Sequence, residues 1–322
     1  MRRLLALAML AFPASAAAAV TPPPSVVALQ EANIRVVAAL SPSVVQIENK
    51  QGLGSGIVFD AKGDIVTNNH VIEGGGPYTV TTSTGKRYPA KLVGAFPPDD
   101  LAVIRVSGAT LQPATFADSS KLHVGDIAIA IGNPLGLRSS VTEGIVSAFR
   151  EGVTEGNGVA LPTMIQTSAA INPGNSGGAL ADIYGRVIGI PTLAANDPQI
   201  GGAAPGIGFA IPSNLVRDVA EQIVQHGKVV NSHRAYLGVS VGDTNGSGVY
   251  VGSVKSGGAA EKAGIKAGDV ITSVAGHATP TLDELSSVLS QLKPGQAVKV
   301  VVQSQDGSKR TVQVTLGQYP GG

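Results

Sequence analysis

The residue best suited to nucleophilic chemistry in this sequence is a serine flanked by glycines. Ser176 stands in the run Gly174-Asn175-Ser176-Gly177-Gly178. Glycine tolerates the backbone angles of a tight turn, and such a turn exposes a hydroxyl while aiming backbone N–H groups at a developing oxyanion. The same run also fits an ordinary Gly/Asn turn between strands. The serine therefore needs partners before it predicts catalysis.

A general base for such a serine is offered by His70, which ends the segment Thr67-Asn68-Asn69-His70 behind an apolar run. A histidine at a strand end can take the serine proton and later return it to a leaving group. A surface histidine without a role is the alternative. The chain has five histidines, and the other four lie in predicted turn, helix-end or linker positions: His123, His226, His233 and His277.

An acidic partner is offered by the segment Asp99-Asp100-Leu101-Ala102-Val103-Ile104. An aspartate that enters an apolar strand is partly buried, and there it can orient an imidazole and stabilise its protonated form. Asp99 and Asp100 are both candidates at this point. By itself the pattern equally fits a turn aspartate before a strand.

Together the three candidates are more informative than each alone. They occur in the order His, Asp, Ser, which is the order of chymotrypsin-type proteases and not that of subtilisin or the α/β-hydrolases. The sequence contains no H-E-x-x-H metal motif. Gly52, Gly54 and Gly56 could be mistaken for a dinucleotide loop, but they precede a predicted strand and not a helix. These patterns predict a serine protease.

Short strands must position these residues. From Ser43 to about Ala210 the chain consists of short apolar runs separated by Gly, Pro, Asn and Asp, several with β-branched residues and period-two alternation. Many strands without intervening helices indicate a sandwich or barrel, so the predicted fold class is mainly β. The clearest predicted strands are 44–47, 56–59, 65–67, 91–93, 101–106, 127–131 and 187–190.

Helices are predicted outside this strand-rich region. A short one covers about 26–39, and another begins at Ser213, which we take as its N-cap, and ends at Gly227. A third follows a capping box formed by Thr281 and Glu284 and continues with apolar residues at helical spacing to Leu292. It lies in a C-terminal region of short strands, which predicts a small α+β domain.

The joint motifs resemble the HtrA (Deg) family of serine proteases from about residue 40 to the C-terminus. The resemblance implies a chymotrypsin-like double six-stranded β-barrel with the active site between the barrels. It implies a triad of His70, Asp100 and Ser176, because the family's aspartate directly precedes an apolar L-A-V run. The matching stretches are Gly54–Gly56, Thr67–Val71, Asp100–Val103, Ala130–Pro134, Ala169–Gly178 and Gly208–Pro212.

The resemblance also implies the groups around the triad. An oxyanion hole is expected from Gly174, Asn175 and Ser176, with the N–H groups of Gly174 and Ser176 as donors. A specificity pocket is expected along one strand, where small and apolar side chains favour a small aliphatic residue at the cleaved position. That strand consists of Ile207, Gly208, Phe209, Ala210 and Ile211.

Two places depart from the family pattern. The family usually has T-D-A-A-I-N before the nucleophile, and this chain has Ser168 in place of the acid. The change bears on how the oxyanion loop is held and removes no triad member. The stretch Arg150–Pro162 occupies the place of the family's regulatory sensor loop, where Arg150 is either its relay arginine or a solvated charge.

The C-terminal region resembles a PDZ domain. Its carboxylate-binding loop corresponds to Tyr236, Leu237, Gly238 and Val239. Backbone N–H groups of such a loop hold a peptide C-terminus while the peptide adds to the sheet as a strand, with helix 282–292 as the other wall. The expected ligand is an apolar C-terminal peptide of an unfolded protein. A packing domain with an occluded groove is the alternative.

The predicted organisation has five parts: a signal peptide at 1–19, an N-terminal arm at 20–40, a protease domain at 41–228, a linker at 229–234 and a PDZ domain at 235–319. Arg2 and Arg3, the apolar run Leu4–Phe12 and the small residues Ala14-Ser15-Ala16 indicate the signal. The run is shorter than the roughly 20 residues of a membrane span, so no transmembrane anchor is expected after cleavage. An uncleaved anchor is the alternative.

Composition excludes several classes of function. The chain has no cysteine, which excludes disulfides, thiol catalysis and thiolate metal sites. Its net charge of +1 gives no nucleic-acid footprint. Because it also has no recognisable nucleotide or metal motif, no cofactor and no metal are predicted.

Three functions are compatible with these features. The first is an ATP-independent endopeptidase that degrades misfolded exported proteins, controlled by apolar C-termini on its PDZ domain. The second is a regulatory protease for one signalling substrate, and the third is a non-catalytic chaperone or PDZ scaffold. The resemblance further implies a homotrimer, and the general pattern favours the periplasm of a Gram-negative cell.

Overall fold

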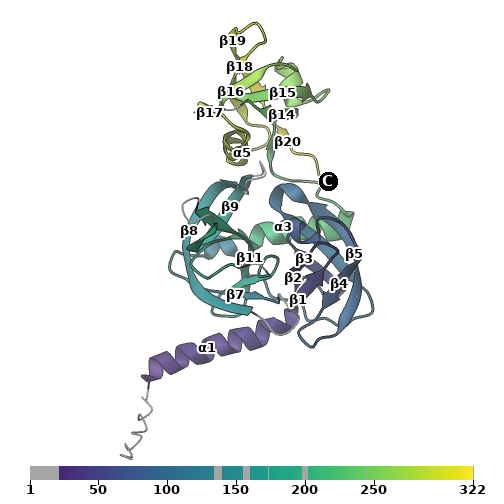
Figure 1. The fold of residues 1–322 in the computed structure, drawn as a ribbon, viewed down its shortest axis with the longest axis vertical. Coiled ribbons are helices and arrows are strands. Elements are labelled where there is room, and N and C mark those ends of the chain that lie inside the picture. The colour runs from purple at the N-terminus through teal and green to yellow at the C-terminus, as the bar shows by residue number, and fades with distance from the viewer. Residues whose placement is uncertain are drawn as a thin grey trace, which may run out of the picture.

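The computed structural model describes residues 22–133, 140–154, 160–172, 174–197, 202–244 and 246–321. Two β-barrels lie side by side, and a smaller C-terminal domain sits at one end of the pair (Figure 1). This arrangement confirms the predicted mainly β fold. The predicted signal peptide at 1–19 lies outside the described residues.

The first barrel closes in the order β1-β2-β3-β6-β5-β4. Its apolar residues divide between two cores: Val45 and Ile47 pack inside the barrel, whereas Val44 belongs to the cluster shared with the second barrel. Successive side chains of a strand point to opposite faces, so a strand buried on both sides reads as a continuous apolar run. The strands are β1 (Val44–Glu48), β2 (Leu53–Val58), β3 (Asp64–Thr67), β4 (Tyr78–Thr81), β5 (Arg87–Phe96) and β6 (Leu101–Val106).

The second barrel closes in the order β10-β11-β12-β9-β8-β7. Within the stretch Arg150–Pro162, expected as a sensor loop, residues up to Thr154 continue β8 and those from Ala160 begin β9, while 155–159 lie outside the described residues. The strands are β7 (Ile127–Gly132), β8 (Ser140–Thr154), β9 (Ala160–Thr167), β10 (Ala179–Ala181), β11 (Val187–Asp197) and β12 (Gly202–Pro212).

Two longer helices flank the barrels. Helix α1 (Pro24–Leu40) leaves the barrels and projects away from them (Figure 1). Helix α3 (Ser213–His226) ends at Gly227, whose φ of 74° gives the left-handed C-cap that glycine favours. Ser213 does not act as the predicted N-cap, because Pro212 holds that position and the Ser213 hydroxyl donates to Ala117 O at 2.8 Å. None of the described helices is long and apolar enough to cross a membrane.

The C-terminal domain is a sheet in the order β14-β15-β16-β18-β19, covered by two helices. Strand β14 is an edge of this sheet, and helix α5 (Leu282–Ser290) begins at Thr281, whose hydroxyl accepts from the Glu284 N–H as predicted. The other elements are β14 (Val239–Asp243), β15 (Val249–Val254), α4 (Ala259–Lys262), β16 (Val270–Val274), β17 (His277–Ala278), β18 (Ala297–Gln303) and β19 (Lys309–Thr315).

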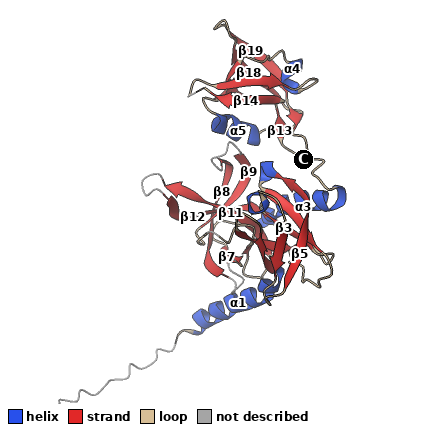
Figure 2. Ribbon diagram, turned by 45° about the vertical axis from the view of Figure 1, so that its right-hand side comes forward, coloured by secondary structure: helices blue, strands red, loops and turns tan. Residues whose placement is uncertain are grey.

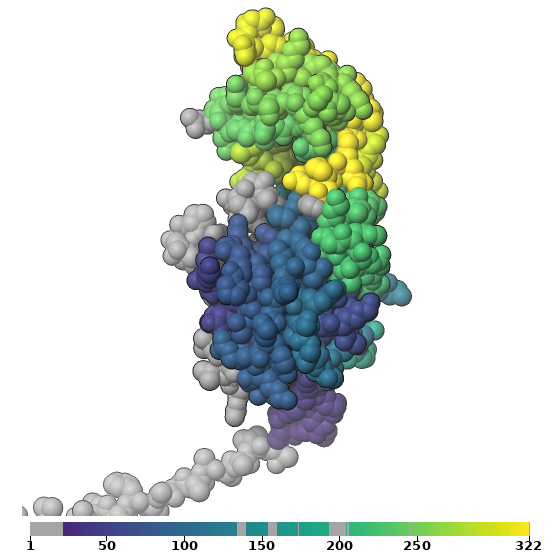
Figure 3. All heavy atoms as spheres, turned by 90° about the vertical axis from the view of Figure 1, so that its right-hand side faces the viewer, coloured from purple at the N-terminus to yellow at the C-terminus, as the bar shows by residue number. Residues whose placement is uncertain are grey.

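The C-terminal domain is joined to the barrels by its own two ends. Its entering strand β13 (Ala235–Tyr236) pairs with its leaving strand β20 (Gly317–Gln318). Tyr319 then packs edge-on against the buried ring of Phe96, with ring centroids 6.2 Å apart, so the C-terminal residues lie across the junction (Figure 3). Helix α5 faces and packs against β8 and β9 (Figure 2).

Phe96 should be one of the side chains on which stability most depends, because its ring is fully buried and also supports Tyr319. We expect Phe96→Ala to lower the free energy of unfolding by about 3–5 kcal/mol, measured by urea denaturation. Tyr184→Ala is the control, since that side chain is 78% exposed, and it should change stability by less than about 0.5 kcal/mol. Equal effects of the two substitutions would show that the Phe96 contact adds nothing.

Candidate active site

Two neighbouring strands of the first barrel bring His70 and Asp100 together. His70 lies on the single-turn helix α2 (Asn69–Ile72) that follows β3, and Asp100 directly precedes β6. Because β3 and β6 pair antiparallel, with Thr67 opposite Ala102, the end of one strand meets the start of the other. The Asn69 N–H donates to Asp100 O at 3.0 Å and fixes this meeting point.

The imidazole of His70 is held by the carboxylate of Asp100 at two points. His70 Nδ1 lies 2.8 Å from Asp100 Oδ2, and the backbone N–H of His70 donates to Oδ1 at 3.0 Å. The Asp100 side chain is 3% exposed and that of His70 is 42% exposed. A buried carboxylate therefore orients an imidazole that is open to substrate, as the predicted pair requires.

Thr192 links this pair to Ser176, and no pattern in the sequence marks this residue. Its hydroxyl donates to Asp100 Oδ2 at 2.5 Å, while its carbonyl accepts from Ser176 Oγ at 3.1 Å. Thr192 lies at a β-bulge in β11, where the pairing with β12 shifts register between Pro191 and Leu193. A bulge turns a residue out of the ladder, which frees Thr192 for these two contacts. Thr192 thus joins Ser176 to Asp100, and Asp100 in turn holds His70.

The glycine-rich loop around Ser176 is a tight turn with defined hydrogen bonds. The Asn175 N–H donates to Asn172 O at 3.0 Å and is therefore used inside the turn. The N–H groups of Gly174 and Ser176 have no hydrogen-bond partner within the described part of the chain. A Cβ at Gly177, whose φ is 79°, would collide with Ser55 O, so only glycine fits there. This geometry leaves Gly174 and Ser176 as the two available donors.

Ser55 is a second contributor, which the sequence marks only as part of the stretch Gly54–Gly56. Its side chain is fully buried, its hydroxyl donates to Gly174 O at 2.5 Å and accepts from the Asn133 N–H at 2.8 Å. Its own N–H donates to Ser176 O at 2.9 Å. Peptide groups are planar, so fixing the carbonyls of Gly174 and Ser176 fixes the backbone planes on either side of the Ser176 N–H. Ser55 thus holds the nucleophile loop from the first barrel.

The predicted specificity strand lies in β12, beside the bulge of β11. Leu193 pairs with Phe209, and Pro191 pairs with Ala210. Within this strand Ile207 is exposed, whereas the backbone of Gly208 approaches Ile171 so closely that a Cβ would collide with it. The other members, Phe209, Ala210 and Ile211, are buried. Ile207 is therefore the side chain of this set that is most open to a ligand.

The two departures from the family pattern have defined surroundings. Ser168 Oγ accepts from the Ile145 N–H at 3.0 Å, so the serine ties the segment before the nucleophile loop to β8. Arg150 lies on β8 and donates from Nε to Gln166 Oε1 at 2.8 Å, on the surface of the β8–β9 pair. Asp99 points away from His70 and pairs with Arg234, which leaves Asp100 as the aspartate of the site.

The four candidate PDZ residues form the loop between β13 and β14. Leu237 O accepts from the Ala260 N–H and Gly238 O accepts from the Lys255 N–H, both at 2.8 Å. In a trans peptide group the N–H points opposite to the carbonyl, so these bonds turn the Gly238 and Val239 N–H groups to the other side of the loop. A cavity of about 240 Å³ lies beside the loop, between β14 and α5. The side chains of the C-terminal domain therefore do not fill the space beside the loop.

No group of three or more histidine and acidic side chains within the described segments could hold a metal ion. Everything gathered at Ser176 is instead a proton donor or acceptor: an imidazole, two hydroxyls, a carboxylate and backbone N–H groups. Such a set suits attack by an activated hydroxyl and stabilisation of an oxyanion.

Comparison with known proteins places both parts of the chain. Residues 54–190 match the trypsin-like peptidase domain family, and residues 235–316 match the PDZ domain family. Serine protease PepD of Mycobacterium tuberculosis is 40% identical over 307 residues, which are 88% of this chain and 66% of PepD. The periplasmic pH-dependent serine endoprotease DegQ of Escherichia coli is 40% identical over 280 residues, 83% of this chain and 59% of DegQ. The chain thus spans less than two thirds of these curated relatives.

Solved structures agree over a larger share of their own chains. The HtrA-type protease AlgW with a decapeptide is 31% identical, has a TM-score of 0.61, and matches 89% of this chain and 98% of its own. The serine endoprotease from Yersinia pestis is 33% identical with a TM-score of 0.60, over 89% of this chain and 97% of its own.

Ser176 should react with a fluorophosphonate, and the reaction should depend on Asp100. We expect Asp100→Asn to slow labelling by about a thousandfold or more, because the imidazole loses the acceptor that orients it. The rate is measured by intact-protein mass spectrometry, and peptide mapping should place the adduct on Ser176. Asp182→Asn, which alters a carboxylate paired with Arg186 away from the site, should label at the normal rate. Unchanged labelling of Asp100→Asn would contradict the assignment.

Ser55→Ala tests the hold on the nucleophile loop. The change leaves Gly174 O and the Asn133 N–H without their partner, so the oxyanion donors lose their fixed position. We expect labelling of Ser176 to slow by about tenfold to a hundredfold while the far-UV circular dichroism stays the same. A folded variant that labels as fast as the parent would show that Ser55 does not position the loop.

Proposed function

Since this chain belongs to the HtrA-type serine proteases, with a trypsin-like peptidase domain followed by one PDZ domain, we propose that it is an ATP-independent endopeptidase for unfolded exported proteins. The observation that carries this proposal is the network in which Thr192 joins Ser176 to Asp100 and His70. It supplies a nucleophile, a base and an orienting acid within one connected set of hydrogen bonds.

The proposed reaction is acyl transfer to Ser176. As Ser176 Oγ bonds to the carbonyl carbon of the scissile peptide, its proton passes to His70 Nε2, and the hydroxyl gives up its contact with Thr192 O. The carbonyl oxygen becomes an oxyanion that the N–H groups of Gly174 and Ser176 stabilise. His70 then protonates the leaving amine, and a water molecule deprotonated by His70 releases the acyl group.

The substrate side of the proposal rests on β12. A substrate side chain that reaches this strand meets Ile207 and the glycine backbone at 208, which offer a shallow apolar surface. Small aliphatic side chains suit such a site before the cleaved bond. Because a substrate must be extended to lie along a strand, unfolded chains are favoured over compact ones.

The PDZ side of the proposal rests on the edge strand β14 and the loop before it. The Gly238 and Val239 N–H groups are oriented to hold a terminal carboxylate, and apolar residues line the cavity beside them: Leu237, Val239, Leu282, Leu285 and Leu289. An apolar C-terminus fits both features. The domain would thereby recruit or sense C-termini that folded proteins hide.

The proposal includes a cellular location and an assembly state for the protein. DegQ is named as periplasmic, and the segment before residue 20 has the pattern of an export signal, so we place the protein in the periplasm. Assembly as a homotrimer is part of the same proposal. The contact of helix α5 with β8 and β9 links the peptide groove to the protease domain, an arrangement that would also serve a regulatory protease with one substrate.

Cleavage of an unfolded model protein tests the proposed activity. Purified mature enzyme should degrade reduced, alkylated lactalbumin without ATP, and Ser176→Ala should leave it intact, because the variant lacks the attacking oxygen. Fragments are followed by gel electrophoresis and their ends by mass spectrometry, which should show small aliphatic residues before the cut. Cleavage by Ser176→Ala at the parent rate would refute the serine mechanism.

The same assay with a peptide that ends in apolar residues tests the PDZ role. We expect such a peptide to raise kcat/KM by about fivefold or more, and the same peptide with a C-terminal amide to do nothing, because it lacks the carboxylate. Absence of cleavage with and without peptide would favour the chaperone or scaffold.

A further inference from the structure

The linker that leads into the PDZ domain sends one charged side chain into the protease domain. Arg234 Nη1 lies 2.5 Å from Asp99 Oδ1, and the two side chains are 14% and 1% exposed. Burial raises the pKa of the Asp99 carboxyl, and the Arg234 guanidinium opposes that rise. The other oxygen, Asp99 Oδ2, has no hydrogen-bond partner among the described residues. Arg234 is therefore the cation that compensates this buried charge.

The pair acts on the turn that presents Asp100. Asp99 ends the short helix η2 (Pro97–Asp99), and Arg234 Nη1 also donates to Pro98 O at 2.6 Å. Asp100 follows directly with a φ of 48°, a left-handed conformation that is costly for a residue with a Cβ. A strained residue keeps its conformation only when its surroundings hold it. Arg234 supplies part of that hold from outside the barrel.

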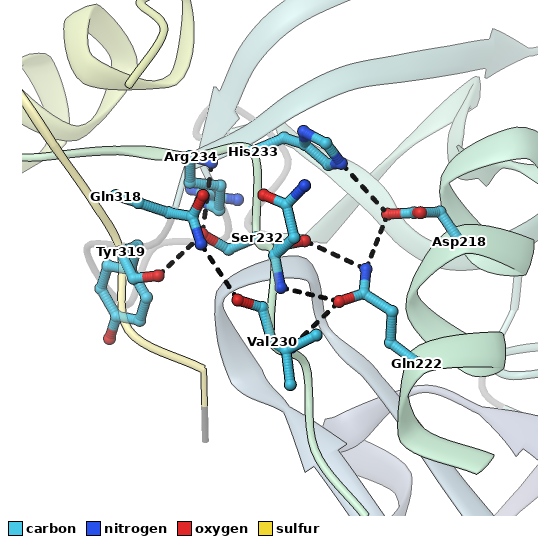
Figure 4. A network of polar contacts seen from close by, with 9 residues as sticks. Asp218, Gln222, Val230, Ser232, His233, Arg234, Gln318 and Tyr319 are labelled. Atoms are coloured by element: carbon cyan, nitrogen blue, oxygen red, sulfur yellow. Dashed lines mark hydrogen bonds and ion pairs between the residues drawn. The ribbon is translucent and has the colours of Figure 1, made fainter. Parts of the chain in front are cut away.

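The backbone of Arg234 is fixed by the far end of the PDZ domain. Arg234 O accepts from the Tyr319 N–H at 2.9 Å, and Ser232 Oγ donates to Tyr319 O at 2.8 Å. Gln222 of α3 holds the preceding linker residues, accepting from the N–H groups of Val230 and Asn231 (Figure 4). The position of Arg234 thus depends on the C-terminal strand, which only a folded PDZ domain presents.

The same arginine borders the peptide groove. One cavity is lined by Leu237, Val239 and Leu285 of the groove and also by Arg234 and Pro98. A peptide side chain that enters this cavity would contact the guanidinium or displace it. The protease domain contributes Pro98 and Ala160 to the lining of this cavity, and Pro98 stands two residues before Asp100.

We propose that Arg234 is a positioning residue that acts through Asp99 on the turn holding Asp100, and that a C-terminal peptide in the groove controls proteolysis through this contact. The inference rests on the proposed function, since it assigns the route by which that groove and that triad communicate. Arg234 touches no substrate at the cleavage site, and its effect is on the placement of the acid.

Coupling between the peptide groove and the active site is reciprocal, so it can be tested from either site. If a peptide in the groove favours the competent triad, then an inhibitor on Ser176 that favours the same state must tighten peptide binding. The full-length mature enzyme is titrated with a fluorescent peptide ending in apolar residues, before and after phosphonylation of Ser176. Stimulation of kcat/KM is measured in parallel.

Three variants separate the contact from general loosening of the linker. Asp99→Asn removes the acid, and Asp99→Asn with Arg234→Gln removes both charges together, so that neither is left buried alone. Gln222→Ala is the matched control, because it releases linker residues 230 and 231 without touching η2. Thermal unfolding of each variant confirms that it is folded.

In the parent we expect about fivefold or greater stimulation of kcat/KM by peptide, and tighter peptide binding after phosphonylation. In the two Asp99 variants, the stimulation factor and the tightening factor should both fall to about one. The affinity of these variants for the peptide in the absence of inhibitor should stay within about twofold of the parent. The Gln222→Ala variant should keep the stimulation of kcat/KM and the tightening of peptide binding that the parent shows.

Coupling that survives in the double variant, or that Gln222→Ala abolishes equally, would overturn the proposal. A parent enzyme that cleaves but shows no coupling would overturn it as well and leave the proposed protease activity intact. Absence of cleavage by the parent under all conditions would count against the proposed function itself.

Discussion

The buried carboxylate of Asp100 is the constraint around which the site is built. A charge that is almost wholly removed from water is costly unless donors surround it. The donors here are the His70 backbone and ring on the first barrel and the Thr192 hydroxyl on the second. Satisfying one carboxylate therefore requires both barrels to be docked, the β11 bulge to be in register and the turn before β6 to be closed.

That requirement explains features that are otherwise unrelated. The strands of the first barrel are apolar on both faces because one face fills the barrel and the other, through residues such as Val44 and Ile57, builds the core shared with the second barrel. Ser55 then uses this fixed docking to hold the loop of Ser176. The precision of the site is a property of the interface between barrels more than of either barrel.

The sequence was sufficient for the fold and for the three candidate residues of the site, because glycine turns, strand periodicity and the order His, Asp, Ser all leave local patterns. Thr192 left none, and Ser55 left only its place in the stretch Gly54–Gly56, because the role of a hydroxyl residue inside a strand appears only when distant segments meet. The sequence around Arg234 predicts a polar linker, since a charge beside Asn and Ser looks solvated until its buried partner is known. Ser213 is not the predicted cap, because its hydroxyl donates to Ala117 O and the helix already includes it.

The pairing of β13 with β20 has a consequence for the order of folding. It joins residues roughly 80 apart in the chain, and closing a loop of that length costs about 4 kcal/mol of entropy, which the interior of the C-terminal domain must first offset. The barrels need no part of that domain to close their sheets. A chain emerging from synthesis can thus complete its barrels early, whereas the contact that steadies the acid waits for the last strand.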